Sequence, residues 1–284
     1  MAEQTPPRAA ATDPGLAVAA VAATADRCAA GTDTPAAGEL GVLARSAGVA
    51  ALAVGAAVAA GALWHGLALA APDRQLLRAL AAYALLLLPL FMHLRAHLPH
   101  RRFGSANTVT LFRAGIVCVL FAAFGEPWHG HAGWIAGAAS VALALDGVDG
   151  WLARHRGSAS RYGARFDMEI DAALGLALAL LAWQSGHAGA WVLAAGALRY
   201  LFIAAMRRLP WLARPLPPSD RRKWLCVLQL IGLIACVAPV LPDLWRTAAA
   251  AVAVALVTVS FAIDIVWLAA HRHADSRSPP GATA

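Results

Sequence analysis

Charged residues are scarce in this chain. They make up only 14% of its 284 residues, whereas 60% of the sequence is hydrophobic. Soluble domains usually carry about 25% charged residues, so the composition excludes an ordinary soluble domain and is typical of a polytopic membrane protein. Cysteine is also scarce. The four cysteines form no C-x-x-C pair and three of them lie in apolar segments, so the sequence implies no disulfide framework.

Acidic residues are fewer than basic ones, 16 against 23, which gives a net charge of +7. A basic chain can bind nucleic acid, but no nucleic-acid-binding motif accompanies these residues. They cluster between apolar segments, which is the pattern of cytoplasmic loops in membrane proteins. We therefore expect membrane lipids and phosphorylated small molecules as partners, and no nucleic acid.

The apolar segments are numerous enough for eight membrane-spanning helices. They cover residues 49–71, 76–94, 107–124, 132–145, 172–183, 191–206, 224–240 and 248–270. The sequence thus predicts an all-α fold, a polytopic membrane helix bundle in which two extra transmembrane helices (41–98) precede a six-helix core (103–272). Residues 1–40 are expected to form a disordered tail and 273–284 a polar tail. Residues 16–23 resemble the core of a signal peptide, but only Arg8 precedes them as a basic side chain, so we expect no cleavage.

Basic residues mark one side of the predicted bundle. They crowd the connections around 95–102, 154–165, 207–223 and 271–277. The alternate connections, around 125–131, 185–190 and 239–246, hold almost none, and the short turn at 72–78 with Arg74 and Arg78 is the exception. By the positive-inside rule both termini face the cytoplasm, and we expect a multi-pass protein of a bacterial inner membrane.

Four carboxylates interrupt the apolar pattern between residues 146 and 171. An ionised side chain near the bilayer centre costs about 2.5–3.5 kcal/mol, so these groups need a partner. Asp146 and Asp149 fall on one face of a helix, and Asp167 and Asp171 form one stripe of the next. When the two helices fold together, the four carboxylates converge and repel one another unless cations bind between them. Hard oxygen ligands favour Mg²⁺ or Mn²⁺. Acids that merely solvate a cytosolic loop are the alternative, but a loop has no reason to keep helical spacing on both sides.

The residues from Asp146 to Asp171 read D-x-x-D-G-x-x-A-R-x8-G-x-x-x-D-x-x-x-D. This pattern closely resembles the signature of the CDP-alcohol phosphatidyltransferase family, and the resemblance extends over about residues 103–270. It implies an enzyme of phospholipid biosynthesis that transfers a phosphatidyl group from a CDP-alcohol, such as CDP-diacylglycerol, to a small alcohol acceptor and releases CMP. It also implies two bound metal ions and a homodimer.

The resemblance carries roles to individual positions. Asp146, Asp149 and Asp167 match metal ligands. Asp171 matches a ligand of the second metal that is also the general base for the acceptor hydroxyl. The positions that match the binding site of the CDP-alcohol are Gly150, Ala153, Arg154 and Gly163, together with Thr110. Thr110 belongs to Asn107-x-x-Thr110-x-x-Arg113, which resembles the N-x-x-T-x-x-R entry segment of the same family.

One feature of the sequence bears on the identity of the acceptor. It is a group of basic residues on the same membrane side as the carboxylates. It consists of Arg207, Arg208, Arg221, Arg222 and Lys223. Such a group can bind the phosphate of glycerol 3-phosphate or an inositol phosphate, which we favour, or it can simply contact anionic lipid headgroups. Departures from familiar members, such as Met168 after Asp167, leave serine or another unphosphorylated alcohol open.

Two other protein classes use membrane carboxylates. Membrane prenyltransferases bind Mg²⁺-diphosphate with Asp-rich helices, but they lack the G-x-x-A-R and x8-G elements. A divalent-cation transporter would carry acids on several helices rather than on two adjacent ones. Outside the pattern, we expect Glu169 to bind a neighbouring arginine such as Arg165, and Asp264 in the last span to pair with a basic residue.

Overall fold

The computed structural model describes residues 37–98, 102–155, 161–217 and 219–271. Most of the predicted N-terminal tail and the predicted tail at 273–284 lie outside these residues. The described part contains eight α-helices, four short 3-10 turns and no strand. The helices are α2 (Ala37–Ala68), α3 (Pro72–Met92), α4 (Ser105–Ala123), α5 (Ala132–His155), α6 (Arg161–Gln184), α7 (Leu193–Arg208), α8 (Asp220–Val237) and α9 (Asp243–Ala270). The predicted all-α fold is confirmed.

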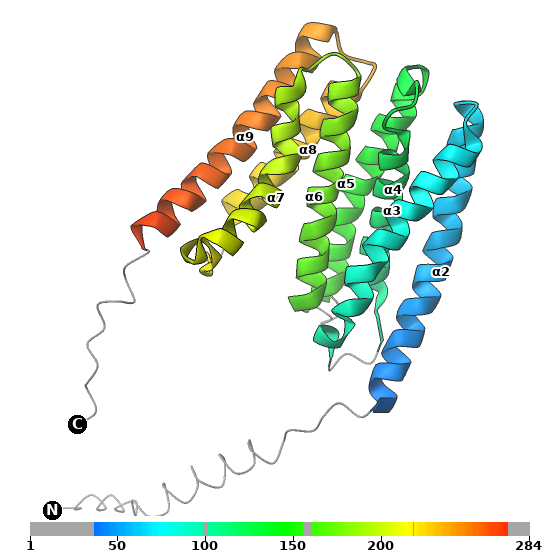
Figure 1. Ribbon diagram of the computed structural model, residues 1–284, viewed down its shortest axis with the longest axis vertical. Helices are drawn as coiled ribbons and strands as arrows, with labels where there is room; N and C mark the ends of the chain where they lie inside the picture. Colours follow the sequence, from blue (N-terminus) through cyan, green and yellow to red (C-terminus); the bar gives the residue numbers. More distant parts are fainter. Residues whose placement is uncertain (1–36, 99–101, 156–160, 218, 272–284) are drawn as a thin grey trace, which may run out of the picture.

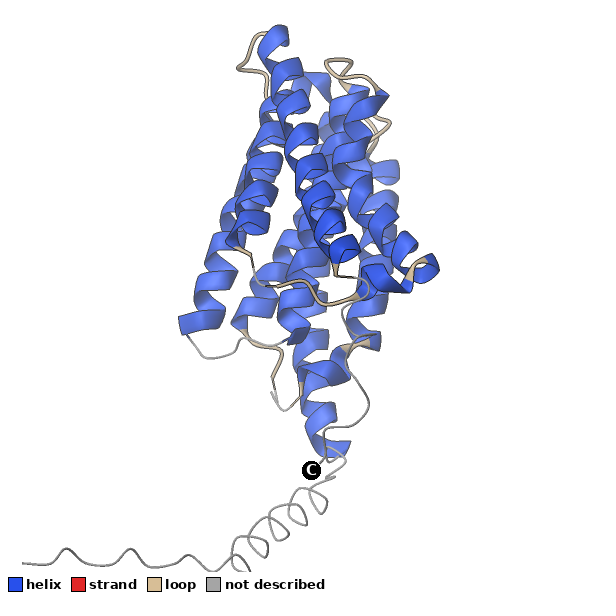
Figure 2. Ribbon diagram, turned by 90° about the vertical axis from the view of Figure 1, so that its left-hand side faces the viewer, coloured by secondary structure: helices blue, strands red, loops and turns tan. Residues whose placement is uncertain are grey.

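All eight helices run side by side along the long axis of the molecule (Figures 1 and 2). Six of them are long and apolar enough to cross a membrane. The other two, α6 and α8, contain more charged residues, but their 24 and 18 residues correspond to about 36 and 27 Å of helix. A bilayer core is about 30 Å thick, so both can accompany the six apolar helices across it. The chain is a polytopic membrane protein.

The first helix is longer than the sequence predicts. The apolar run predicts a span over 49–71, whereas α2 begins at Ala37 and includes residues 37–40 of the expected tail. Its first turns are polar on one side only. Leu43 and Ala47, one turn apart, are fully buried, and the Ser46 hydroxyl accepts a hydrogen bond of 2.9 Å from the backbone N–H of Phe103. One-sided packing of this kind extends a helix beyond its uniformly apolar part.

Helices α2 and α3 form a hairpin that packs against α4. The Tyr83 hydroxyl of α3 donates a hydrogen bond of 2.9 Å to the carbonyl oxygen of Ala51 in α2. Gly115 of α4 lies so close to α2 that a Cβ atom there would come within 2.8 Å of Val58 Cγ2 and 3.1 Å of Val54 Cγ1. A glycine at this contact thus lets the hairpin approach the core closely.

An ion-pair group ties the same hairpin to the other end of the core. The side chain of Glu126, between α4 and α5, is 3% exposed, and its carboxylate lies 3.1 Å from Arg78 Nη1 and 3.5 Å from Arg74 Nη1. Gln184 at the end of α6 donates to the Glu126 carbonyl oxygen at 2.7 Å. Arg74 and Arg78 are therefore matched by a buried carboxylate, which explains why basic residues occur on the side of the bundle whose connections otherwise hold almost none.

Candidate active site

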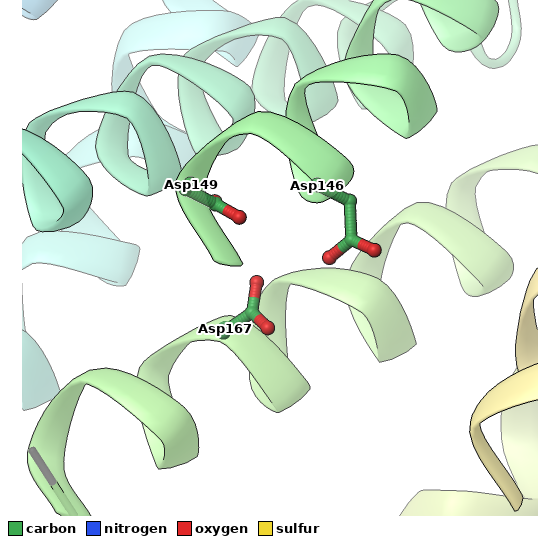
Figure 3. Close-up of side chains that lie close together, drawn as sticks. All are labelled: Asp146, Asp149 and Asp167. Atoms are coloured by element: carbon green, nitrogen blue, oxygen red, sulfur yellow. The ribbon is translucent and has the colours of Figure 1, made fainter. Parts of the chain in front are cut away.

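The predicted carboxylates converge where α5 and α6 meet. Asp146 and Asp149 extend from α5 toward Asp167 on α6 (Figure 3). One carboxylate oxygen from each lies within 4.8 Å of the other two. Helical spacing explains this arrangement, since residues three or four apart share a face of a helix. The predicted convergence of the acidic group is confirmed for these three residues.

A single guanidinium lies among the carboxylates, and sequence reasoning missed it. The side chain of Arg113, on α4, is fully buried. It ion-pairs with all four aspartates: Nη1 lies 3.1 Å from Asp146 Oδ1, 2.9 Å from Asp149 Oδ2 and 2.5 Å from Asp167 Oδ1, and Nη2 donates to Asp171 Oδ1. The fourth aspartate thus joins the group through Arg113. We expected Arg113 only as a motif residue, without a role.

Thr110 lies one turn before Arg113 on the same face of α4. Its hydroxyl is 2.9 Å from Asp149 Oδ2 and 3.1 Å from the carbonyl oxygen of Ala106. Thr110 is buried, with 4% of its surface exposed. The N-x-x-T-x-x-R spacing was the signal for both residues, because positions three apart contact the same neighbouring helix.

A cavity of about 450 Å³ opens between the carboxylates and the C-terminal helices. Its acidic side is formed by Asp146, Asp167 and Asp171, with Gly150 beside them. Its wall also includes three cationic side chains, Arg199 on α7 and Arg222 and Lys223 at the start of α8. The cavity is therefore lined by opposite charges, carboxylates that can bind cations and cations that can bind a phosphate.

Comparison with known families decides the class of this site. The family model described as CDP-alcohol phosphatidyltransferase matches residues 103–263, more than half of the chain. The chain belongs to the CDP-alcohol phosphatidyltransferase family. No curated protein and no solved structure matches it. As a family member it is a membrane transferase of substituted phosphate groups, and it transfers a phosphoalcohol from a CDP-alcohol to an alcohol acceptor. Helices α2 and α3 precede the matched residues.

The structure describes some of the residues that the sequence predicts to bind the CDP-alcohol. Gly150 lines the cavity next to the carboxylates. Gly163 lies in the first turn of α6, one turn before Asp167. Ala153 and Arg154 belong to the last turn of α5, and their side chains lie outside the described part of the structure.

The predicted acceptor residues divide into two groups. Arg222 and Lys223 line the cavity, and Arg222 Nη1 lies 3.7 Å from Asp264 Oδ1 of α9, which also belongs to the cavity wall. Arg221 is not among the described lining residues, and its Nη2 lies 2.6 Å from the same oxygen, which confirms the basic partner expected for Asp264. Arg207 and Arg208 are exposed in the last turn of α7, and neither belongs to the described cavity wall.

Arg199 is a cavity residue that the sequence analysis did not select. Its Nη2 lies 2.7 Å from Glu169 Oε1. The expected arginine partner of Glu169 is confirmed, but it is Arg199 on α7 rather than Arg165 on its own helix. A glycine at this helix contact explains the geometry. Gly196 of α7 lies against the backbone of Leu176 in α6, one turn before Arg199, and so brings the two helices together.

The carboxylates fit a divalent metal. Arg113 supplies one positive charge, whereas the four aspartates can carry four negative charges. Arg113 alone therefore does not neutralise the group. Asp149 Oδ1 is buried and has no hydrogen-bond partner among the described residues. A buried carboxylate oxygen without a partner is costly, and hard oxygen donors suit Mg²⁺ or Mn²⁺. The aspartates are thus a suitable metal centre for this metal-dependent family.

Proposed function

We propose that this enzyme transfers the phosphatidyl group of CDP-diacylglycerol to a phosphorylated polyol and releases CMP. The observation that supports the proposal is the cavity between Asp146, Asp167 and Asp171 and the cationic side chains of Arg222 and Lys223. The carboxylates provide a metal centre for the diphosphate of the donor. The cations provide a binding site for a second phosphate, which an acceptor such as glycerol 3-phosphate or an inositol phosphate carries.

Metal binding is assigned to the four aspartates. Asp146, Asp149, Asp167 and Asp171 would hold two Mg²⁺ or Mn²⁺ ions, which neutralise the diphosphate and polarise the phosphorus under attack. Gly150, Ala153, Arg154 and Gly163 would admit the cytidine nucleotide. Thr110, predicted to bind the donor, would also hold Asp149 through its hydroxyl, and their hydrogen bond of 2.9 Å supports this role.

The transfer itself needs a base and a correctly placed acceptor. The acceptor hydroxyl oxygen attacks the lipid-side phosphorus, its proton passes to the carboxylate of Asp171, and the bond from phosphorus to the oxygen of CMP breaks. Asp171 lines the cavity, where an acceptor hydroxyl can reach it. Arg222, Lys223 and Arg199 would orient the acceptor phosphate, and positioning of this kind contributes much of the rate in phosphoryl-group chemistry.

The cavity opens at the end of the bundle where basic residues gather, among them those of the α7–α8 connection. This end is proposed to face the cytoplasm of a bacterial cell, where nucleotide substrates occur. Serine or another unphosphorylated alcohol is the alternative acceptor. Membership of the family argues against the prenyltransferase and the cation transporter, because neither shares the matched sequence. The homodimer stays a prediction from the resemblance.

An acceptor panel tests the proposal. The purified protein is incubated with CDP-diacylglycerol and Mn²⁺, and CMP release and lipid products are measured with glycerol 3-phosphate, inositol 1-phosphate, serine, inositol or no acceptor. We expect metal-dependent CMP release that is fastest with a phosphorylated polyol. A preference for serine or inositol would contradict the proposed acceptor class, and no CMP release with any acceptor would contradict the donor.

Matched variants locate the acceptor phosphate. Lys223→Gln removes a cation from the cavity wall and should raise the KM for the phosphorylated acceptor by about tenfold, since a charged hydrogen bond contributes about 1.5–3 kcal/mol. Arg207→Gln removes the same charge from the exposed end of α7 and serves as the control, with KM unchanged. Equal effects of the two variants would show that the loop acts only through its overall charge.

A further inference from the structure

Arg113 contacts every carboxylate of the acidic group. Its partners are Asp146 Oδ1, Asp149 Oδ2, Asp167 Oδ1 and Asp171 Oδ1. The guanidinium is itself held in place, since Nε donates a hydrogen bond of 3.0 Å to the carbonyl oxygen of Ala142 in α5. A planar guanidinium has several fixed N–H groups, so it can hold several oxygens in a defined arrangement, which an ammonium cannot do.

Arg113 reaches the carboxylates from the side of α4, away from the cavity. Asp146, Asp167 and Asp171 belong to the cavity wall, whereas Arg113 is fully buried and is not among the described lining residues. A substrate in the cavity therefore meets the carboxylates first. One carboxylate oxygen of the group has no hydrogen-bond partner among the described residues, namely Asp149 Oδ1, which is buried.

We propose that Arg113 is a positioning residue that holds the four aspartates together before metal binds, and that its positive charge lowers the affinity for the metal. This inference rests on the proposed metal-dependent function. Four carboxylates this close repel one another, so the metal-free site needs a resident cation. Once divalent ions bind the carboxylates, the same cation repels them. Arg113 therefore stabilises the metal-free protein more than the metal-bound protein.

A residue with only a structural role would behave differently. Its loss would lower the stability with and without metal by the same amount and would leave the metal affinity unchanged or weakened. Loss of Arg113 should instead destabilise the metal-free protein and strengthen metal binding, because binding and stability are linked through the same charge. The two measurements move in opposite directions, which separates the two roles.

The experiment compares three variants of the full-length protein in detergent, by thermal unfolding with EDTA or saturating Mn²⁺ and by electron paramagnetic resonance of free Mn²⁺. Arg113→Met removes the positive charge. The Tm of this variant should fall mainly in EDTA. Its affinity for Mn²⁺ should rise about tenfold, because a like charge close to the metal has been removed. Arg113→Lys keeps the charge and loses the fork, so its Tm in EDTA should fall with little gain in affinity. This variant also keeps the test informative if Arg113→Met fails to fold.

Arg78→Met is the matched control. Arg78 also pairs with a buried carboxylate, that of Glu126, but it belongs to the opposite end of the bundle. Its loss should lower the Tm equally with and without Mn²⁺. Unchanged or weaker Mn²⁺ binding by Arg113→Met would overturn the role of Arg113 alone. Failure of the wild type to bind Mn²⁺ would overturn the proposed metal-dependent function itself.

Discussion

The contact between α6 and α7 at Gly196 gives a sharp test of the active-site geometry. A Cβ atom at this position would lie 2.4 Å from Leu176 Cα and 2.9 Å from the Leu176 backbone nitrogen. Carbon atoms in contact are normally about 3.5–4.0 Å apart, so Gly196→Ala requires the helices to separate by roughly 1 Å. The obstructing atoms belong to the backbone of α6 and cannot rotate away.

The size of the effect follows from opposing contributions. Overpacking of a well-filled contact typically costs about 1–3 kcal/mol. Replacement of glycine by alanine in a helix returns about 0.5–1 kcal/mol. A net loss of about 1–2 kcal/mol in the free energy of unfolding is expected. Activity should suffer more, because α6 carries Asp171 and α7 carries Arg199 on the same cavity wall. A misplacement of about 1 Å can cost on the order of 100-fold in rate.

The assay measures CMP release from CDP-diacylglycerol together with the Tm in the same detergent. Gly137→Ala in α5 is the matched control, since no heavy atom lies within 4 Å of its Cβ position. This control should keep wild-type activity and gain slightly in stability. If Gly196→Ala equalled the wild type in both Tm and rate, the close approach of α6 and α7 would not position the cavity walls, and the reasoning would be refuted.

Three further variants or treatments test the acidic group. Asp171→Asn should abolish turnover and leave Mn²⁺ binding partly intact; substantial residual CMP release would count against Asp171 as the base. Thr110→Val removes the hydroxyl near Asp149 and should weaken Mn²⁺ binding about tenfold, as expected for a hydrogen bond to a charged group; unchanged binding would separate Thr110 from the metal centre. EDTA should stop CMP release, and added Mg²⁺ or Mn²⁺ should restore it; activity that persists in EDTA would contradict metal dependence.

Local features of the sequence predicted much of this molecule. The apolar runs gave the order and approximate position of all eight helices. The convergence of Asp146, Asp149 and Asp167 was predictable because helical spacing puts such residues on one face, and a short connection brings α5 and α6 together. Both features depend only on residues that are close together in the sequence, so a single sequence is enough to infer them.

Contacts between helices distant in the sequence were not predictable in the same way. Arg113 belongs to α4, the helix before the first two aspartates. The order of residues in the sequence does not predict that its guanidinium lies among the four carboxylates. Glu169 has Arg165 one turn away on its own helix, yet it pairs with Arg199 because α7 packs closely on α6. The basic group of the α7–α8 connection likewise divides by packing. Arg221 and Arg222 both pair with Asp264, but only Arg222 belongs to the described cavity wall.

The packing of α4 connects the extra hairpin to the chemistry. In the apolar window of α4, 72% of the residues are buried, against 28% or less in the other five candidate spans. Helices α2 and α3 pack on this helix, through contacts such as that of Gly115 with Val58. Thr110 and Arg113, also on α4, contact the carboxylates of α5 and α6. A guanidinium in hydrocarbon is costly unless protein surrounds it. The hairpin replaces lipid around α4 and so helps to keep Arg113 in an environment made of protein. Disruption of the contact at Gly115 should therefore reach the aspartates, although the hairpin itself contributes no carboxylate to them.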